Sequence, residues 1–331
     1  MSKDNILVKG WCPSLEKPME TGDGLLVRLP LKFGRLSAEI ARDIAELSKT
    51  YGNGHLDLST RGNLQFRGVS EASYIELRSE LKKLGFERDS RLAIITNPLA
   101  KDMQKIAEEL EESYIYNEHL PEKYLIVIDG GGVFPLTDIP CDLYIPLTPS
   151  SPAGEGGGGA SLVKSIISKL STATKCNKKP ASEEKINQQL GFVPLAEKTG
   201  IVIAICEFGR LEAEQLAKLA DIAQRLGSGE IVLAPKRMII LPNINKLDAE
   251  AVVSYIEKVG LIVNNADARK NIYACVGSPA CSSAFGETRQ FAKKYAIEHP
   301  NLDKIVHITG CPKGCAYKGK ADITIDLSTN L

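Results

Sequence analysis

The chain has 331 residues, of which 43% are hydrophobic and 25% are charged, and its 41 Lys and Arg residues balance its 41 Asp and Glu residues. These values are typical of a folded, soluble protein of two or three domains, and they exclude a largely disordered or fibrous chain. The zero net charge argues against nucleic-acid binding and membrane-surface binding, and no apolar run reaches the roughly 18 residues that a membrane helix needs.

A duplicated unit is the main feature of the chain. Residues 33–58 match residues 208–233 at a constant offset of 175, with ten identical positions. In each copy an apolar strand precedes an amphipathic helix, and a second strand, a reversal and a closing helix follow. The first strands and the closing helices are predicted at 24–30 and 70–85, and at 201–208 and 248–259. This order predicts two ferredoxin-like halves related by a pseudo-twofold axis.

The segment between the two copies predicts a further α/β layer. Residues 124–132 and 141–147 are apolar runs of strand length. Residues 148–161 are rich in Gly, Ser and Pro and are predicted to form a mobile loop, which the polar tract 172–184 extends. The loop lacks the Gly-Lys-Ser/Thr of a phosphate-binding loop.

The predicted fold is therefore α/β (α+β), with duplicated ferredoxin-like halves and additional α/β layers. The predicted domains are 1–88, the first half; 89–190, an α/β domain with the glycine-rich loop; 191–264, the second half; and 265–331, a short α/β domain that carries the metal site.

Two close pairs of cysteines lie near the end of the chain. Cys275 and Cys281 are separated by five residues, and Cys311 and Cys315 by three. The chain opens without a secretory leader, so we expect a cytoplasmic protein whose thiols stay reduced and are available to a metal. Four thiolates are the usual ligands of an iron–sulfur cluster. Zinc is less favoured because its cysteine pairs are commonly two to four residues apart, and buried thiols without a metal are a third interpretation. The other cysteines and the four histidines show no ligand spacing.

Four polar side chains alternate along the segment that follows the first duplicated helix. Arg61, Asn63, Gln65 and Arg67 are two residues apart, so in a strand they lie on one face. Arginine binds carboxylates through two parallel hydrogen bonds. The face is suited to an anionic ligand, although an ordinary exposed polar face has the same pattern.

The cysteine spacing, Cys-x5-Cys followed by Cys-x3-Cys after a duplicated ferredoxin-like half, resembles the nitrite and sulfite reductase superfamily over nearly the whole chain. The segment TRGNLQFRG is similar to the Thr-Arg-Gln-x-x-Gln-x-His segment of that superfamily. This resemblance implies that Arg61 and Gln65 bind the carboxylates of a tetrapyrrole. Gly62 and Arg67 depart from the pattern, because they replace Gln and His.

The same resemblance extends to cations in both copies. Arg28 is similar to the arginine that faces the active centre of the superfamily. Lys236 and Arg237 correspond to a segment that carries two alternating lysines in sulfite reductases, but Ile239 stands where the second cation is expected. The resemblance therefore implies catalytic roles for Arg28 and Arg237, a ligand-binding role for Lys236, and a pocket poorly suited to sulfite.

The opening segment, GWCPSLEKPMETGDGLLVRLP, is most similar to the precorrin-3B synthase family. This implies an oxidoreductase of aerobic cobalamin biosynthesis that hydroxylates precorrin-3A with dioxygen and closes a lactone. It implies a [4Fe–4S] cluster on the four cysteines, a possible mononuclear non-haem iron, and NADH or a reductase or ferredoxin as electron donor. Two alternatives stay open. One is a siroheme-dependent sulfite or nitrite reductase, and the other is a non-catalytic tetrapyrrole-binding or electron-transfer protein.

Overall fold

The computed structural model describes residues 12–86, 92–114, 120–121, 124–147, 158–173, 175–182 and 188–329. The chain forms two compact units. The first unit comprises residues 1–88 and 189–331, and the second comprises residues 89–188. No helix within the described ranges is long and apolar enough to cross a membrane.

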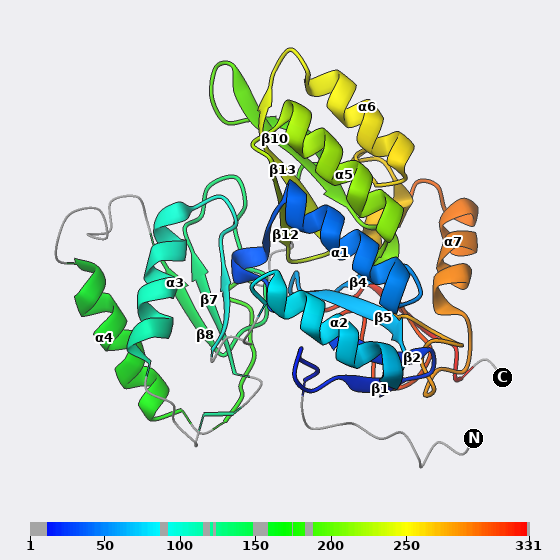
Figure 1. Ribbon diagram of the computed structural model, residues 1–331, viewed down its shortest axis with the longest axis horizontal. Helices are drawn as coiled ribbons and strands as arrows, with labels where there is room; N and C mark the ends of the chain where they lie inside the picture. Colours follow the sequence, from blue (N-terminus) through cyan, green and yellow to red (C-terminus); the bar gives the residue numbers. More distant parts are fainter. Residues whose placement is uncertain are drawn as a thin grey trace. The chain divides into compact units, whose positions relative to one another are not determined.

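The two sequence repeats fold into the same order of elements, so the predicted duplication of ferredoxin-like halves is confirmed (Figure 1). The first copy consists of β1 (Met19–Thr21), β2 (Gly24–Arg28), β3 (Arg35–Ser37), α1 (Ala38–Tyr51), β4 (His55–Leu58), β5 (Leu64–Val69) and α2 (Glu71–Lys83). The second consists of β9 (Gly191–Pro194), β10 (Thr199–Ile205), β11 (Arg210–Glu212), α5 (Ala213–Leu226), β12 (Glu230–Ala234), β13 (Met238–Asn245) and α6 (Ala249–Val259).

The two copies exchange a strand. One sheet has the order β1-β2-β5-β4-β11 and the other β3-β12-β13-β10-β9, so each copy adds one strand to the edge of the other copy's sheet. The helices form a row in the order α2, α1, α5, α6, with α1 and α5 side by side at the centre (Figure 1). Each sheet is therefore completed only when both copies are folded.

A tight turn leads into each exchanged strand, and it depends on glycine. Gly34 has a φ of +70°, and a Cβ atom at this position would lie 1.9 Å from the carbonyl oxygen of Leu233, in the other copy. Gly54 serves as a comparison outside these turns, since it lies between α1 and β4. It has a similar φ of +77°, but a Cβ atom there would have no neighbour within 4 Å. The two glycines therefore separate the cost of the left-handed backbone from the cost of the close approach.

We expect Gly34→Ala to lower the free energy of unfolding by about 3 kcal/mol or more, because it adds a backbone clash to the strain of a left-handed alanine. Gly54→Ala should lower the free energy of unfolding by only the left-handed strain, roughly 1–2 kcal/mol. Urea or thermal unfolding of the two variants measures the difference. Equal losses would show that the exchanged strand does not depend on the contact with Leu233.

The two sheets differ on the face that points away from the helices. On the helix side both sheets contribute to one apolar core, which includes Val27, Leu56, Phe66, Val202, Ile231 and Leu241. On the opposite face, the residues of the first sheet that lie in register are Arg28, Gln65, Asp57 and, on the exchanged strand β11, Arg210. The equivalent residues of the second sheet are Ile203, Ile240, Val232 and, on the exchanged strand β3, Arg35, of which the first three are fully buried. Only the first sheet presents a polar face.

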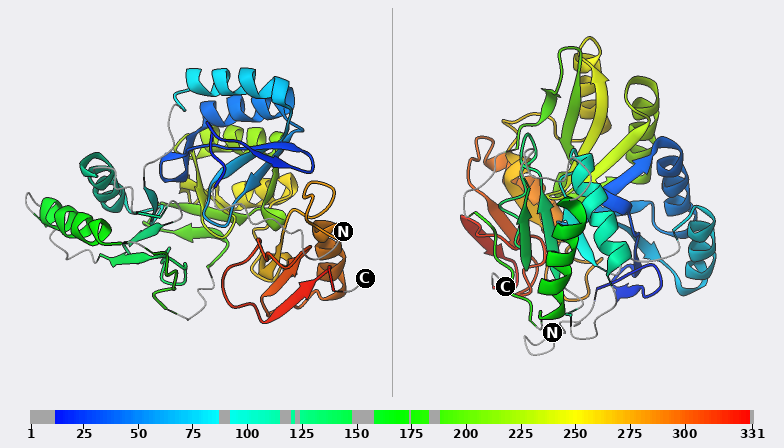
Figure 2. Two further views of the ribbon diagram at one scale, coloured as in Figure 1. Left: turned by 90° about the horizontal axis from the view of Figure 1, so that it is seen from below. Right: turned by 90° about the vertical axis from the view of Figure 1, so that its left-hand side faces the viewer.

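The C-terminal part of the first unit is a small parallel sheet with one helix. The strands are β14 (Ile272–Ala274), β15 (Val306–Thr309) and β16 (Ile323–Asp326), and the helix is α7 (Thr288–Glu298), drawn in orange in Figure 2. Cys275 directly follows β14, and Cys311 follows β15 after one residue. The carboxyl ends of parallel strands meet at one edge of a sheet, so the two cysteine pairs start from the same edge.

The second unit contains the predicted strands of the α/β layer. The parallel strands β6 (Ala93–Thr96), β7 (Leu125–Asp129) and β8 (Leu143–Pro146) are accompanied by α3 (Lys101–Ser113) and α4 (Gly158–Ser171). The sequence analysis predicted neither helix. Residues 148–157 of the expected mobile loop lie outside the described residues, and residues 158–161 begin α4 instead of continuing a loop. The apolar residues Val163, Ile166 and Leu170 explain this helix, since they recur at helical spacing and are buried.

Candidate functional site

A row of polar side chains crosses four strands of the first sheet. Arg28 on β2 pairs in register with Gln65 on β5, which pairs with Asp57 on β4, which in turn pairs with Arg210 on β11. The row exists because these residues alternate with apolar ones that enter the helix-side core. The Nε atom of Arg28 is buried and has no hydrogen-bond partner among the described residues. Arg28 therefore retains a buried donor that an anionic ligand could satisfy.

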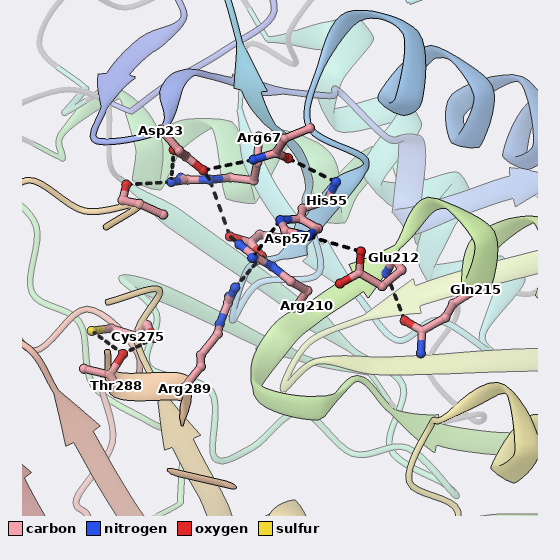
Figure 3. Close-up of polar contacts among 12 residues, drawn as sticks. Asp23, His55, Asp57, Arg67, Arg210, Glu212, Gln215, Cys275, Thr288 and Arg289 are labelled. Atoms are coloured by element: carbon pink, nitrogen blue, oxygen red, sulfur yellow. Dashed lines mark hydrogen bonds and ion pairs between the residues drawn. The ribbon is translucent and has the colours of Figure 1, made fainter. Parts of the chain in front are cut away.

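Asp57 lies between three arginines (Figure 3). Its carboxylate is 2.9 Å from Nη1 of Arg289, 3.0 Å from Nε of Arg210 and 3.7 Å from Nε of Arg67. Burial by itself would raise the pKa of Asp57, but the charges of Arg289, Arg210 and Arg67 outweigh it and lower that pKa to about 2. Asp57 is therefore ionised at neutral pH and compensates part of a cationic cluster.

Arg67 is held inside this cluster and is only 2% exposed. Its Nη2 atom donates to Asp23 at 2.6 Å and to the carbonyl oxygen of Ala280, the residue before Cys281, at 2.9 Å. The sequence analysis assigned Arg67 to tetrapyrrole binding and did not foresee these contacts. Through these contacts Arg67 joins the sheet to the loop between Cys275 and Cys281, and its ligand-binding role stays a prediction.

The turns that carry the other predicted cations meet at the boundary of the two copies. The backbone N–H of Lys236 donates to the carbonyl oxygen of Thr60 at 3.0 Å, so the Lys236 turn adjoins the Arg61 turn. Gln65 lies on β5, whereas Arg61 and Asn63 lie in the turn before it and not on the strand that the sequence predicted, and all three side chains are half-buried. The structure therefore brings Arg61, Asn63, Gln65 and Lys236 into one region, and their roles as ligand-binding residues stay predictions.

Arg237 has a different environment from the one predicted for a catalytic residue. It is 4% exposed, and its two terminal nitrogens donate to the carbonyl oxygens of Ile272 at 2.9 Å and Lys270 at 3.1 Å. Its guanidinium also lies 4.2 Å from the centre of the Tyr273 ring. These contacts anchor the segment that leads into Cys275. Its catalytic role stays a prediction.

Cys311 and Cys315 respond electrostatically to the other cysteines of the C-terminal part. Burial of the thiol raises the pKa of Cys311, and the nearby Cys281 and Cys275 raise it further. Burial likewise raises the pKa of Cys315, with added contributions from Cys311, Cys275 and Cys281. Two loops that are about 30 residues apart in sequence thus gather four thiols in one region.

Backbone N–H groups point at two of these sulfur atoms. Gly310 donates to Cys275 Sγ at 3.3 Å, and the backbone of Lys313 donates to the thiol of Cys311. Thr288, the first residue of α7, donates through its hydroxyl to the carbonyl oxygen of Cys275 at 2.6 Å. Such hydrogen bonds stabilise thiolates and tune the potential of an iron–sulfur cluster.

No three His, Cys, Asp or Glu side chains in the described part of the chain are grouped so that they could hold one metal ion. Zinc needs its sulfur ligands within about 2.3 Å of a single centre. A four-iron cluster takes one thiolate on each iron and so accepts more widely separated cysteines. The donor set of Cys275, Cys281, Cys311 and Cys315, with N–H groups directed at sulfur, fits such a cluster.

The sequence analysis missed the residues that connect the polar row to the cysteine loops, namely Asp57, Arg210, Thr288 and Arg289. One signal was present, because Asp57 interrupts the otherwise apolar end of a strand, His-Leu-Asp-Leu. A charged residue in such a strand is normally paired. The partner on α7 lies 232 positions further along the chain, and no local pattern marks it.

Comparisons with known proteins match the two copies of the repeat and the chain as a whole. The nitrite/sulfite reductase ferredoxin-like half domain matches residues 17–84 and 196–259. The precorrin-3B synthase of Sinorhizobium sp is 28% identical, over 96% of this chain and 80% of that protein. The chloroplastic ferredoxin–nitrite reductase of Arabidopsis thaliana is 24% identical, over 97% of this chain and 70% of that protein.

A solved structure shows the same fold. The NirA protein of Mycobacterium tuberculosis superposes with a TM-score of 0.71 at 20% identity, covering 90% of this chain and 70% of that chain. The resemblance predicted from the repeats and the cysteine spacing is therefore confirmed. The chain carries two nitrite/sulfite reductase ferredoxin-like half domains, and oxidoreductases are among its relatives.

Proposed function

We propose that this chain, with its two nitrite/sulfite reductase ferredoxin-like half domains, is an oxidoreductase of the precorrin-3B synthase type. In this proposal it hydroxylates precorrin-3A with dioxygen and forms a lactone, in aerobic cobalamin biosynthesis. The observation that carries the proposal is the polar row on the first sheet, which the second sheet replaces by buried isoleucine and valine. Because only one of the two sheets offers arginine and amide groups, the chain is suited to bind a single carboxylated macrocycle.

Arg28, Arg61 and Gln65 are the residues proposed to bind and orient this substrate. A guanidinium donates two parallel hydrogen bonds to a carboxylate, and Gln65 lies in register beside Arg28. Asn63 and Lys236 extend the same region. Asp57 cannot donate a proton at neutral pH because its pKa is about 2. Its role is therefore to hold arginines and not to act as a general acid.

The proposed [4Fe–4S] cluster would be held by Cys275, Cys281, Cys311 and Cys315, and it would supply electrons one at a time. The overall reaction takes one dioxygen, two electrons and two protons. One oxygen atom enters the product, and the other leaves as water. The electrons come from a donor such as NADH or a ferredoxin. Oxygen insertion also needs an oxygen-activating centre, for which a mononuclear non-haem iron is the candidate.

Siroheme-dependent reduction of sulfite or nitrite is the second candidate, favoured by the reductases among the relatives. Two observations weigh against a pocket for a small anion. Ile239 is 1% exposed and packs in the helix-side core, where a second cation is expected. Both terminal nitrogens of Arg237 donate to backbone carbonyl oxygens instead of to an anion. Charge-assisted hydrogen bonds are the strong contacts of such a pocket, so losing them weakens it.

The test is an incubation of anaerobically reconstituted protein with precorrin-3A, an electron donor and ¹⁸O-labelled dioxygen. We expect mass spectrometry to find one labelled oxygen in a hydroxylactone product. An unlabelled substrate, together with consumption of sulfite or nitrite by siroheme-loaded protein, would support the reductase instead. If the protein binds precorrin-3A and keeps its cluster but neither reaction occurs, the proposal fails in favour of a binding or electron-transfer role.

A further inference from the structure

Two consecutive residues at the start of α7 connect the polar row to the first cysteine pair. Thr288 turns toward Cys275, with its hydroxyl 2.6 Å from the Cys275 carbonyl oxygen and 3.5 Å from Sγ. Arg289 turns the opposite way, and its Nη1 atom lies 2.9 Å from Asp57 (Figure 3). The contact with Asp57 and the contact with Cys275 therefore start from adjacent positions at the beginning of one helix.

A second connection runs through Arg67. It contacts Asp57 on the sheet, and it donates to the carbonyl oxygen of Ala280, which also accepts the backbone N–H of Gly22 at 3.0 Å. Ala280 precedes Cys281. Each cysteine of the first pair is thus linked to an arginine that contacts Asp57. Cys275 is linked through Thr288, the neighbour of Arg289, and Cys281 through Ala280. The third arginine, Arg210, joins Asp57 to the exchanged strand β11.

The charges around Asp57 are unevenly compensated. Arg67 also has Asp23 as a counter-charge, whereas Arg210 has His55 as a further hydrogen-bond partner, 2.9 Å away, which carries no negative charge. Arg289 has Asp57 as its ion-pair partner, and its Nε atom is buried without a hydrogen-bond partner among the described residues. Removal of the Asp57 charge therefore affects Arg289 and Arg210 more than Arg67, and Arg289 lacks even the hydrogen-bond partner that Arg210 has in His55.

We infer that Asp57 is a positioning residue that couples the polar face to the cysteine site. By holding Arg289 and Arg67, it fixes Cys275 and Cys281 relative to the ligand-binding row and thereby sets the redox potential and the retention of the cluster. The inference rests on the proposed function, because it takes the four cysteines as cluster ligands.

The first experiment compares the parent protein with Asp57→Asn after anaerobic reconstitution. We expect the midpoint potential of the cluster to shift to more positive values, because a negative charge is lost and a cation is left uncompensated nearby. We expect retention of the cluster against an iron chelator to fall by roughly 10- to 100-fold, as is usual when a group supporting metal ligands is lost. Asp57→Glu, which keeps the charge, should restore most of both properties.

Two further variants separate positioning from loss of stability. Asp129→Asn removes another buried carboxylate, which accepts hydrogen bonds from Gly131, Leu136 and Tyr144 in the second unit, and it should leave the potential unchanged. Asp57→Asn should shift the potential less in an Arg289→Gln background than in the parent protein, because the part of the effect that passes through Arg289 is already lost while the Arg67 route and the charge itself remain.

A readout without the cluster completes the test. In the apoprotein, alkylation of Cys275 and Cys281 by iodoacetamide, followed by mass spectrometry, should be about tenfold faster in Asp57→Asn, while Cys176 reacts at the parent rate. Unchanged alkylation rates, or an unchanged potential in a protein that does hold a cluster, would overturn the inference. A parent protein that holds no cluster but shows the expected change in alkylation would overturn the cluster assignment and leave the positioning role of Asp57 standing.

Discussion

Replacement of Cys275 and Cys311 together by alanine is expected to abolish binding of the iron–sulfur cluster. The parent protein, purified and reconstituted without oxygen, should contain about four irons and four sulfides per chain beyond any mononuclear iron. The double variant removes one ligand from each cysteine loop, so two irons lose their protein thiolate. Iron and sulfide analysis, together with the visible absorption of the cluster, measures the loss.

The matched control is the double variant Cys141→Ala/Cys176→Ala, which removes two thiols of the second unit. Cys141 is buried and Cys176 is exposed, and neither contributes to the pKa shifts of Cys311 and Cys315. This variant should keep its full iron content. An intact cluster in Cys275→Ala/Cys311→Ala would refute the assignment of these ligands.

Replacement of Arg28 by alanine is expected to weaken binding of precorrin-3A by roughly 30-fold. A buried arginine–carboxylate contact contributes on the order of 2 kcal/mol, and 1.4 kcal/mol corresponds to a tenfold change in Kd. Arg61→Ala should have an effect of similar size. Titration followed by absorbance or fluorescence measures both, with uroporphyrin as a stable carboxylated probe.

Arg42→Ala provides the comparison for this titration. Arg42 lies on α1, on the helix side of the sheet, and pairs with Asp221 in an exposed salt bridge. Its loss removes the same charge from the chain without touching the polar row, so Kd should stay at the parent value. If Arg28→Ala and Arg42→Ala behaved alike, the polar row would not be the binding face.

The duplicated halves could be predicted from the sequence because their signals are local. A gap-free offset of 175 preserves the Phe-Gly-Arg-Leu turn and the helix that follows it, and each closing helix has its own apolar face. The exchange of β3 and β11 could not be predicted. A three-residue strand carries no pattern that names its partner, and the pairing depends on contacts between the two copies.

The site was predictable to a similar extent. Alternation placed Gln65 on the polar face of β5, but Arg61 and Asn63 precede the strand, in a turn where Gly62 has a φ of +82°. Alternation could not show that Arg67, on the same face, is covered by Asp23 and the Ala280 carbonyl. Those contacts join residues more than 40 and 200 positions apart, so they follow from the tertiary fold and not from spacing.

The central claim is that the polar face of the first sheet takes a carboxylated tetrapyrrole as substrate and does not hold a resident siroheme. The absorption spectrum of the anaerobically purified protein, together with extraction of its tetrapyrroles, tests this claim most directly. The account predicts the broad shoulder of an iron–sulfur cluster, no extractable siroheme, and a spectral change on addition of precorrin-3A that Arg28→Ala diminishes. Intense visible siroheme bands in the purified protein, with stoichiometric siroheme in the extract, would contradict it.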